Sequence, residues 1–135
     1  MPEYVVLIVG DADRWWTTMD ADQRAAGYAE YTRFGEELNR RGHTITGGAE
    51  LHSTTEGKRI PGGGGAVTDG PFAEVTEQVG GFYQVRTDDL DDLVDCCQII
   101  AALGDTVEVR RTVSPSAAMI WQQSTRSSRS SVRTW

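Results

Sequence analysis

An uninterrupted apolar run near the N-terminus constrains the fold of this chain more than any other feature. Residues 4–9 read YVVLIV and contain no charged side chain. Alternating apolar and polar residues are typical of a strand with one face in water, whereas a continuous apolar run indicates burial on both faces. We therefore expect residues 4–9 to form a strand whose sheet is covered on both sides.

Two segments have the apolar spacing of amphipathic helices. The first spans about residues 21–41, because Asp20 and Gln23 have the spacing of a capping box and Gly42 suits the end of a helix. The second helix is expected to begin after Asp88, its predicted N-cap. Its buried stripe is predicted to contain Leu90, Leu93, Val94, Cys97 and Ala101.

The remaining strands follow from alternation and from turn residues. We assign strands to residues 43–51, 81–86 and 107–113, and a hairpin to residues 58–60 and 66–68 around a run of glycines. This order predicts a ferredoxin-like α+β subunit, with one antiparallel sheet and both helices on one face. Since the helices leave the other face of the first strand open, we expect a second copy to cover it in a homodimer.

Composition restricts the partners of this chain. All 20 acidic side chains lie in residues 1–113 with 10 of the 13 basic ones, a net charge of −10, which is unfavourable for binding nucleic acid. No apolar run has the length of a membrane helix, so no membrane partner is expected. Cys96 and Cys97 are adjacent and suit free thiols in a reducing cytoplasm. Residues 1–113 are predicted to be one domain, and the Arg- and Ser-rich residues 114–135 a partly disordered tail.

Few of the familiar catalytic motifs are possible here. The glycine run is not followed by Lys-Ser/Thr, and there is no CxxC, HExxH or Gly-x-Ser-x-Gly sequence. His43 and His52 are nine residues apart, which places them on opposite faces of a regular strand. We therefore expect neither a metal site nor a cofactor. Trp15 and Trp16, predicted to lie in a loop, should line a cavity or plug one end of the sheet.

The corner formed by Asp69, Gly70 and Pro71 is the most distinctive local feature. Proline has a fixed φ and disfavours helical geometry in the residue before it, so the chain must turn here. Asp69 can accept hydrogen bonds from nearby backbone N–H groups, as aspartates in turns do. The result is a rigid corner that carries one carboxylate.

The residues around this corner resemble a known family. DGPF at residues 69–72 and EQVGGFY at residues 77–83 are similar to the signature of the DGPF branch of the YCII-related proteins. The similarity extends over roughly residues 3–113 and includes GD at residues 10–11 and GAEL at residues 48–51. The resemblance implies a dimeric α+β barrel built from ferredoxin-like subunits.

The resemblance also suggests two classes of function. YCII relatives are proposed to use a His–Asp pair, and one branch includes a dechlorinating lyase that acts on a chlorinated aromatic diol. Their histidine lies midway along the first helix, where this chain has Gly27-Tyr28-Ala29-Glu30-Tyr31 and no histidine. From this resemblance the chain is predicted to bind a small organic molecule in a pocket at the DGPF loop, as a lyase or isomerase. The alternative is a non-catalytic binding or regulatory module associated with sigma-factor-type transcription control.

Asp69 is the leading candidate for acid–base chemistry in the predicted pocket. Aromatic neighbours would raise the pKa of its carboxyl group and suit it to accept a substrate proton. Tyr31 and His52 are the alternative proton donors. The residues expected to bind the substrate are Gly70, Pro71, Phe72, Tyr83, Tyr28 and Trp15. The simpler interpretation, in which Asp69 only stabilises the turn, remains open.

Overall fold

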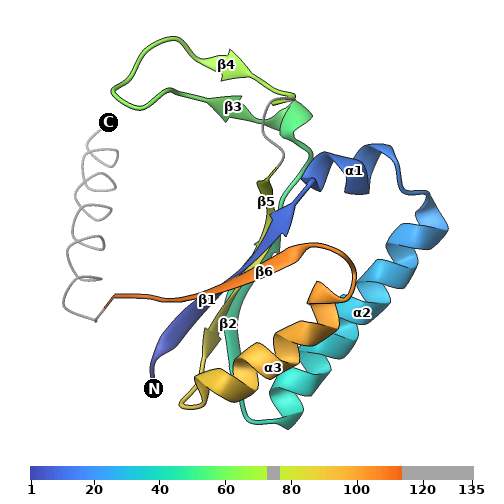
Figure 1. Ribbon diagram of the computed structural model, residues 1–135, viewed down its shortest axis with the longest axis vertical. Helices are drawn as coiled ribbons and strands as arrows, with labels where there is room; N and C mark the ends of the chain where they lie inside the picture. Colours follow the sequence, from blue (N-terminus) through green and yellow to red (C-terminus); the bar gives the residue numbers. More distant parts are fainter. Residues whose placement is uncertain (73–76, 114–135) are drawn as a thin grey trace, which may run out of the picture.

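The computed structural model describes residues 1–72 and 77–113 of the chain. Its main sheet has four antiparallel strands in the order β2-β5-β1-β6, with β1 (Glu3–Gly10) and β5 (Gln78–Arg86) in the centre. The edge strands are β2 (Thr44–Glu50) and β6 (Thr106–Arg111). Two helices, α2 (Ala21–Arg40) and α3 (Leu90–Ala101), cover the same face of the sheet (Figure 1). The predicted ferredoxin-like α+β fold is confirmed. The predicted tail, residues 114–135, lies outside the described residues.

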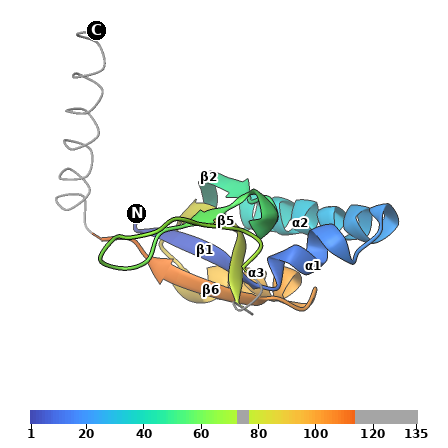
Figure 2. The same ribbon diagram turned by 90° about the horizontal axis from the view of Figure 1, so that it is seen from above.

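The predicted hairpin is also present, as a second sheet of two short strands. β3 (Lys58–Arg59) pairs antiparallel with β4 (Thr68–Asp69), and a single 3₁₀ turn, η1 (Thr54–Glu56), leads into it. This hairpin lies beyond the end of the main sheet at which β5 begins (Figures 1 and 2). The DGPF corner therefore starts on an element separate from the four-stranded sheet.

The hydrophobic core lies between the main sheet and the two long helices. On β1, Tyr4, Val6 and Ile8 face the helices and are buried, and on α2 Phe34 and Leu38 are fully buried against them. The alternate residues of β1, which include Val5 and Leu7, are only half-buried on the opposite face. In the single chain the apolar first strand is thus fully covered on one face, and covering the other by a second copy stays a prediction.

The start of α2 agrees with the sequence pattern. The Asp20 carboxylate accepts a hydrogen bond from the Gln23 backbone N–H at 2.8 Å, and the Gln23 side chain accepts one from the Asp20 N–H at 2.9 Å. This reciprocal capping box satisfies two of the N–H groups that a helix start leaves unpaired. Within the described residues, no helix combines the length and the apolar character that a membrane crossing requires.

The start of α3 differs from the prediction by one residue. Asp89, not Asp88, is the N-cap, because its carboxylate accepts a hydrogen bond from the Asp92 N–H at 3.0 Å. The buried stripe also differs. It consists of Leu93, Cys96, Cys97 and Ile100, whereas Leu90 and Val94 are about 40% exposed. The buried residues follow the i, i+3, i+4, i+7 spacing of one helical face, and the predicted stripe mixed this row with the neighbouring one.

The prediction of a loop at the two tryptophans is wrong. Trp15 and Trp16 lie in α1 (Ala12–Thr17), a short helix that directly follows β1. The Asp11 carboxylate caps it by accepting a hydrogen bond from the Arg14 N–H at 3.1 Å. A capped start after β1 was not recognised in the sequence because six residues are too few to show a helical apolar period.

Candidate functional site

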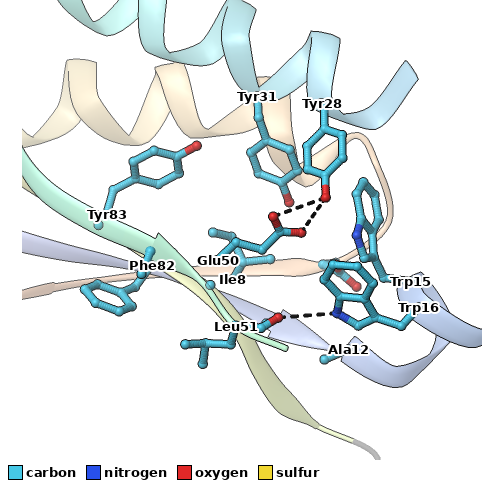
Figure 3. Close-up of a pocket in the computed structure, with 15 residues that line it drawn as sticks. Ile8, Ala12, Trp15, Trp16, Tyr28, Tyr31, Glu50, Leu51, Phe82 and Tyr83 are labelled. Atoms are coloured by element: carbon cyan, nitrogen blue, oxygen red, sulfur yellow. Dashed lines mark hydrogen bonds between the residues drawn. The ribbon is translucent and has the colours of Figure 1, made fainter. Parts of the chain in front are cut away.

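A cavity of about 310 Å³ lies at the end of the sheet where β1 stops and β5 starts, under the first turns of α2. We call it the Glu50 cleft. It is lined by Ile8, Ala12, Trp15, Trp16, Tyr28, Tyr31, Gly48, Ala49, Glu50, Leu51, Gly80, Gly81, Phe82, Tyr83 and Asp105 (Figure 3). Apart from two carboxylates and the polar tips of aromatic rings, these side chains are apolar. This composition is typical of a small-molecule site.

A glycine on the helix-facing side of the sheet leaves room for the cleft. Gly81 of β5 lies between Ile8 of β1 and Glu50 of β2 in the strand register. Residues directly opposite each other on neighbouring strands point to the same face of a sheet. The row Ile8–Gly81–Glu50 therefore lacks its central side chain. In the next row Gly48 is opposite Tyr83, and it serves a different purpose: a Cβ on Gly48 would lie 2.6 Å from the Phe82 carbonyl oxygen, so glycine permits the close approach of β2 to β5.

The polar centre of the cleft is a hydrogen-bonded pair. The Tyr28 hydroxyl lies 2.9 Å and 3.1 Å from the two carboxylate oxygens of Glu50, and it donates its proton to that group (Figure 3). Tyr28 comes from the first turns of α2, while Glu50 is the last residue of β2. Tyr31 is three residues after Tyr28, on the same face of the helix, and its hydroxyl also points toward Glu50 (Figure 3).

The tyrosines of the cleft are neutral hydrogen-bond donors. Burial, and next the hydrogen bond to Glu50, raise the pKa of Tyr28 above its usual value. Burial together with the charges of Asp105 and Glu50 raises the pKa of Tyr31 to about 12. The pKa of Tyr83 is raised mainly by burial and further by the charge of Glu50. At neutral pH all three rings keep their protons.

Trp15 forms a wall of the cleft because Gly27 makes room for it. The Trp15 and Tyr28 rings meet edge to face, with centroids 5.2 Å apart and an interplanar angle of 79°. A Cβ atom on Gly27 would lie 2.5 Å from Cη2 of Trp15, closer than van der Waals contact permits. Of the two roles predicted for the tryptophans, the structure shows the lining of a cavity.

Trp16 connects the cleft to one of the two histidines. Its ring stacks on His52 with centroids 5.2 Å apart, and its Nε1 donates a hydrogen bond to the Leu51 carbonyl at 3.3 Å. His52 itself is exposed and does not line the cleft. Its predicted role as a proton donor would therefore have to be exerted from outside the cavity.

The DGPF corner does not reach the Glu50 cleft. Asp69 is 73% exposed, and its carboxylate pairs with the Lys58 ammonium group at 2.5 Å on the neighbouring strand of the hairpin. The Arg59 guanidinium lies over the ring of Phe72, with its Cζ atom 5.3 Å from the centroid of that ring. Of the residues predicted to form one site, the structure brings together Trp15, Tyr28, Tyr31 and Tyr83. It places Asp69, Gly70, Pro71, Phe72 and His52 outside the lining of the cleft.

The corner is nevertheless anchored to a wall of the cleft through Asp13 of α1. The Asp13 carboxylate accepts hydrogen bonds from the Thr54 hydroxyl at 2.5 Å, the Thr54 N–H at 2.7 Å and the Ser53 hydroxyl at 3.0 Å. These bonds, that of the Thr54 hydroxyl first, lower the pKa of Asp13. The Phe72 N–H in turn donates to the Thr54 hydroxyl at 3.3 Å. A Cβ on Gly70 would lie 1.5 Å from the Thr54 carbonyl oxygen, so only glycine fits this approach.

Glu50 and Asp105 are the acidic residues of the cleft that the sequence analysis did not select. Asp105 lies just before β6, and desolvation is the main cause that raises the pKa of its partly exposed carboxyl group. The sequence offered one signal for Glu50: two glycines and an alanine precede it in a strand, a stretch with little side-chain volume around a single carboxylate. For Asp105, a turn residue between a helix and a strand, we find no such signal.

One group of side chains outside the cleft has the chemistry of metal ligands. His43, Asp92 and Cys96 offer donor atoms that all lie within 4.8 Å of one another. The His43 ring, however, already joins Thr87 at 2.7 Å and Asp92 at 2.6 Å, and Arg41 lies 3.1 Å from the same carboxylate. The positive charge of Arg41 opposes a metal ion at this position. The group is better explained as a link between the start of β2 and the start of α3.

Comparison with known proteins identifies the family of this chain. A comparison with curated proteins finds no match. A family model, the YCII-related domain, matches residues 3–114, which include every helix and strand that the structure describes and the whole Glu50 cleft. The chain belongs to the family of YCII-related domain proteins.

Proposed function

We propose that this protein binds a small organic molecule in the Glu50 cleft. The observation that carries the proposal is the cavity itself, about 310 Å³ between aromatic side chains with a carboxylate at its centre. Cavities of this size and composition hold small ligands. The alternative predicted from the sequence, a non-catalytic binding or regulatory module associated with sigma-factor-type transcription control, would be favoured by a solid interior with an exposed apolar groove, so the cavity favours the small-molecule function.

Within this proposal, Glu50 rather than Asp69 is the group suited to accept a proton. Glu50 is also exposed to solvent, but its carboxylate faces the cavity and is oriented by the Tyr28 hydroxyl at 2.9 Å. Asp69 is exposed and paired with Lys58 on the hairpin. A general base must lie within hydrogen-bonding reach of the proton that it removes. If the protein is a lyase or isomerase, Glu50 would take the substrate proton and Tyr28 or Tyr31 would donate a hydrogen bond to the developing negative charge.

Binding can be tested with a neutral aromatic probe, benzyl alcohol, added to the full chain in an NMR titration. We expect the indole N–H signals of Trp15 and Trp16 to shift, because both rings line the cleft. The variant Ala12→Phe fills part of the cleft and should weaken binding. Ala29→Phe is the control, since Ala29 is an exposed residue of α2 outside the lining. Unshifted indole signals, or equal binding by Ala12→Phe, would contradict the proposal.

The catalytic part can be tested separately once a turnover assay with an organic substrate shows activity. Glu50→Gln keeps the size of the side chain but cannot act as a base, and we expect it to lower kcat by about 100-fold or more. Asp69→Asn should leave kcat within about twofold, because Asp69 lies outside the cleft. The opposite ranking of the two variants would return the catalytic role to Asp69.

A further inference from the structure

We propose that the Glu50 cleft selects a positively charged organic group, of the class of protonated amines and quaternary ammonium ions. This inference rests on the proposed function, because it names the kind of molecule that the same cleft would take. It is argued from the partners of Glu50, from the charges around the cavity and from the chemistry of its walls.

Glu50 differs from most paired acids of this protein in its partner. Six other acidic side chains form ion pairs with arginine or lysine: Glu3, Glu30, Glu37, Asp69, Asp92 and Asp95. Among the described residues, Glu50 has no such ion pair, and its side-chain partner is the neutral Tyr28 hydroxyl. That hydroxyl has one proton to donate, whereas a carboxylate offers about four acceptor positions. Glu50 therefore has acceptor positions free for a ligand in the cavity.

The rest of the cleft does not neutralise the charge of Glu50. No lysine, arginine or histidine is among the lining residues that the structure describes, and Asp105 adds a second carboxylate. The nearest positive charges lie outside the lining: Arg24 acts on Tyr28, and Arg14 acts on Asp105. The negative charges act on the neighbouring tyrosines, since Glu50 contributes to the raised pKa of both Tyr31 and Tyr83. A ligand anion would meet the same repulsion, whereas a ligand cation would supply the missing counter-charge.

The walls of the cleft suit the apolar surroundings of an organic cation. Trp15, Trp16 and Tyr28 stand around Glu50, with the ring of Trp15 edge-on to that of Tyr28 (Figure 3). The faces of tryptophan and tyrosine rings attract ammonium groups within about 6 Å of the ring centroid. A carboxylate surrounded by such rings offers an amine both a charged partner and a surface for its carbon atoms.

Three probes that share one ring and differ in charge test the inference on the full chain by calorimetry and NMR. They are benzylammonium, benzyl alcohol and benzoate at pH 7. We expect benzylammonium to bind about tenfold or more tightly than benzyl alcohol, as a hydrogen bond to a charged group allows, and benzoate to bind most weakly. Glu50→Gln should lower the affinity for benzylammonium about tenfold, and its affinity for benzyl alcohol should stay within about twofold of that of the natural chain.

Glu30→Gln is the matched control for charge. It removes one carboxylate from α2, where Glu30 pairs with Arg33 outside the cleft, and should change benzylammonium binding by less than about twofold. The inference is overturned if benzoate binds at least as tightly as benzylammonium, or if Glu50→Gln and Glu30→Gln have equal effects. Binding of benzyl alcohol with no preference for the cation would overturn this inference alone. Failure of all three probes to shift the Trp15 and Trp16 signals would overturn the proposed function with it.

Discussion

The packing of Trp15 against Gly27 gives the most direct test of the structure of the cleft. Gly27→Ala adds one methyl group, whose carbon would lie 2.5 Å from Cη2 and 2.7 Å from Cζ3 of Trp15. Gly35→Ala is the matched variant on the same helix, α2, where the new carbon would meet only Ile45 Cδ1 at 3.9 Å, an ordinary contact.

The two variants are expected to change stability in opposite directions. Replacing glycine by alanine inside a helix stabilises it by about 0.8–1 kcal/mol, a gain that applies to both positions. Overfilling a packed site costs about 1–3 kcal/mol, and this applies only to Gly27, because Trp15 cannot move without losing its contact with Tyr28. We expect Gly35→Ala to raise the free energy of unfolding by up to about 1 kcal/mol. The free energy of unfolding of Gly27→Ala should be about 1–3 kcal/mol lower than that of Gly35→Ala.

Chemical denaturation at one fixed protein concentration measures this difference, and a thermal scan should show it as about 4 °C in Tm per kcal/mol. Gly27→Ala should also weaken benzyl alcohol binding, since Trp15 lines the cleft, while Gly35→Ala should leave binding unchanged. If Gly27→Ala stabilised the protein as much as Gly35→Ala and bound the probe equally well, Trp15 would not be packed as described.

Three further predictions concern pH, the hairpin and assembly. Asp105 has a raised pKa, so its carboxyl group binds a proton more tightly in the folded chain than in the unfolded chain. The protonated carboxyl group therefore favours the folded state at low pH, and this stabilisation is lost as the pH rises above 3.8, the ordinary pKa of aspartate. Urea unfolding should show Asp105→Asn gaining stability relative to the natural chain between about pH 4 and pH 7; a gap that stays constant or reverses would contradict this. Asp69→Asn should lower the free energy of unfolding by less than about 1 kcal/mol, because its ion pair with Lys58 is exposed on both sides, and a larger loss would indicate a partner not seen here. Light scattering should give about twice the chain mass, because none of the helices in residues 1–72 and 77–113 covers the half-buried face of β1 that holds Val5 and Leu7. A monomer at micromolar concentration would refute the homodimer.

The elements of this fold were predictable because their signals lie within a few residues of one another. The two residues of the capping box, Asp20 and Gln23, are three positions apart, and the apolar run of β1 is continuous. Local patterns failed where more than one neighbouring row was possible, as in α3, whose buried face was assigned to Leu90 and Val94 instead of Cys96 and Ile100. Which row faces the core is decided by the surface against which the helix packs.

The site depended on contacts between distant parts of the chain, which only the tertiary structure decided. By itself the sequence determined the family, the order of the strands and the two long helices, and a set of aromatic residues from which Trp15, Tyr28, Tyr31 and Tyr83 do line one cleft. It did not determine that Glu50 would be their polar centre, because Tyr28 and Glu50 are 22 residues apart. Their meeting depends on the strand register that puts Gly81 beside Glu50 and leaves the space open. Asp69 lies on the short hairpin, which is a sheet separate from the one that forms the cleft. For this reason Asp69 does not line the cleft, although the sequence around it predicts a rigid corner.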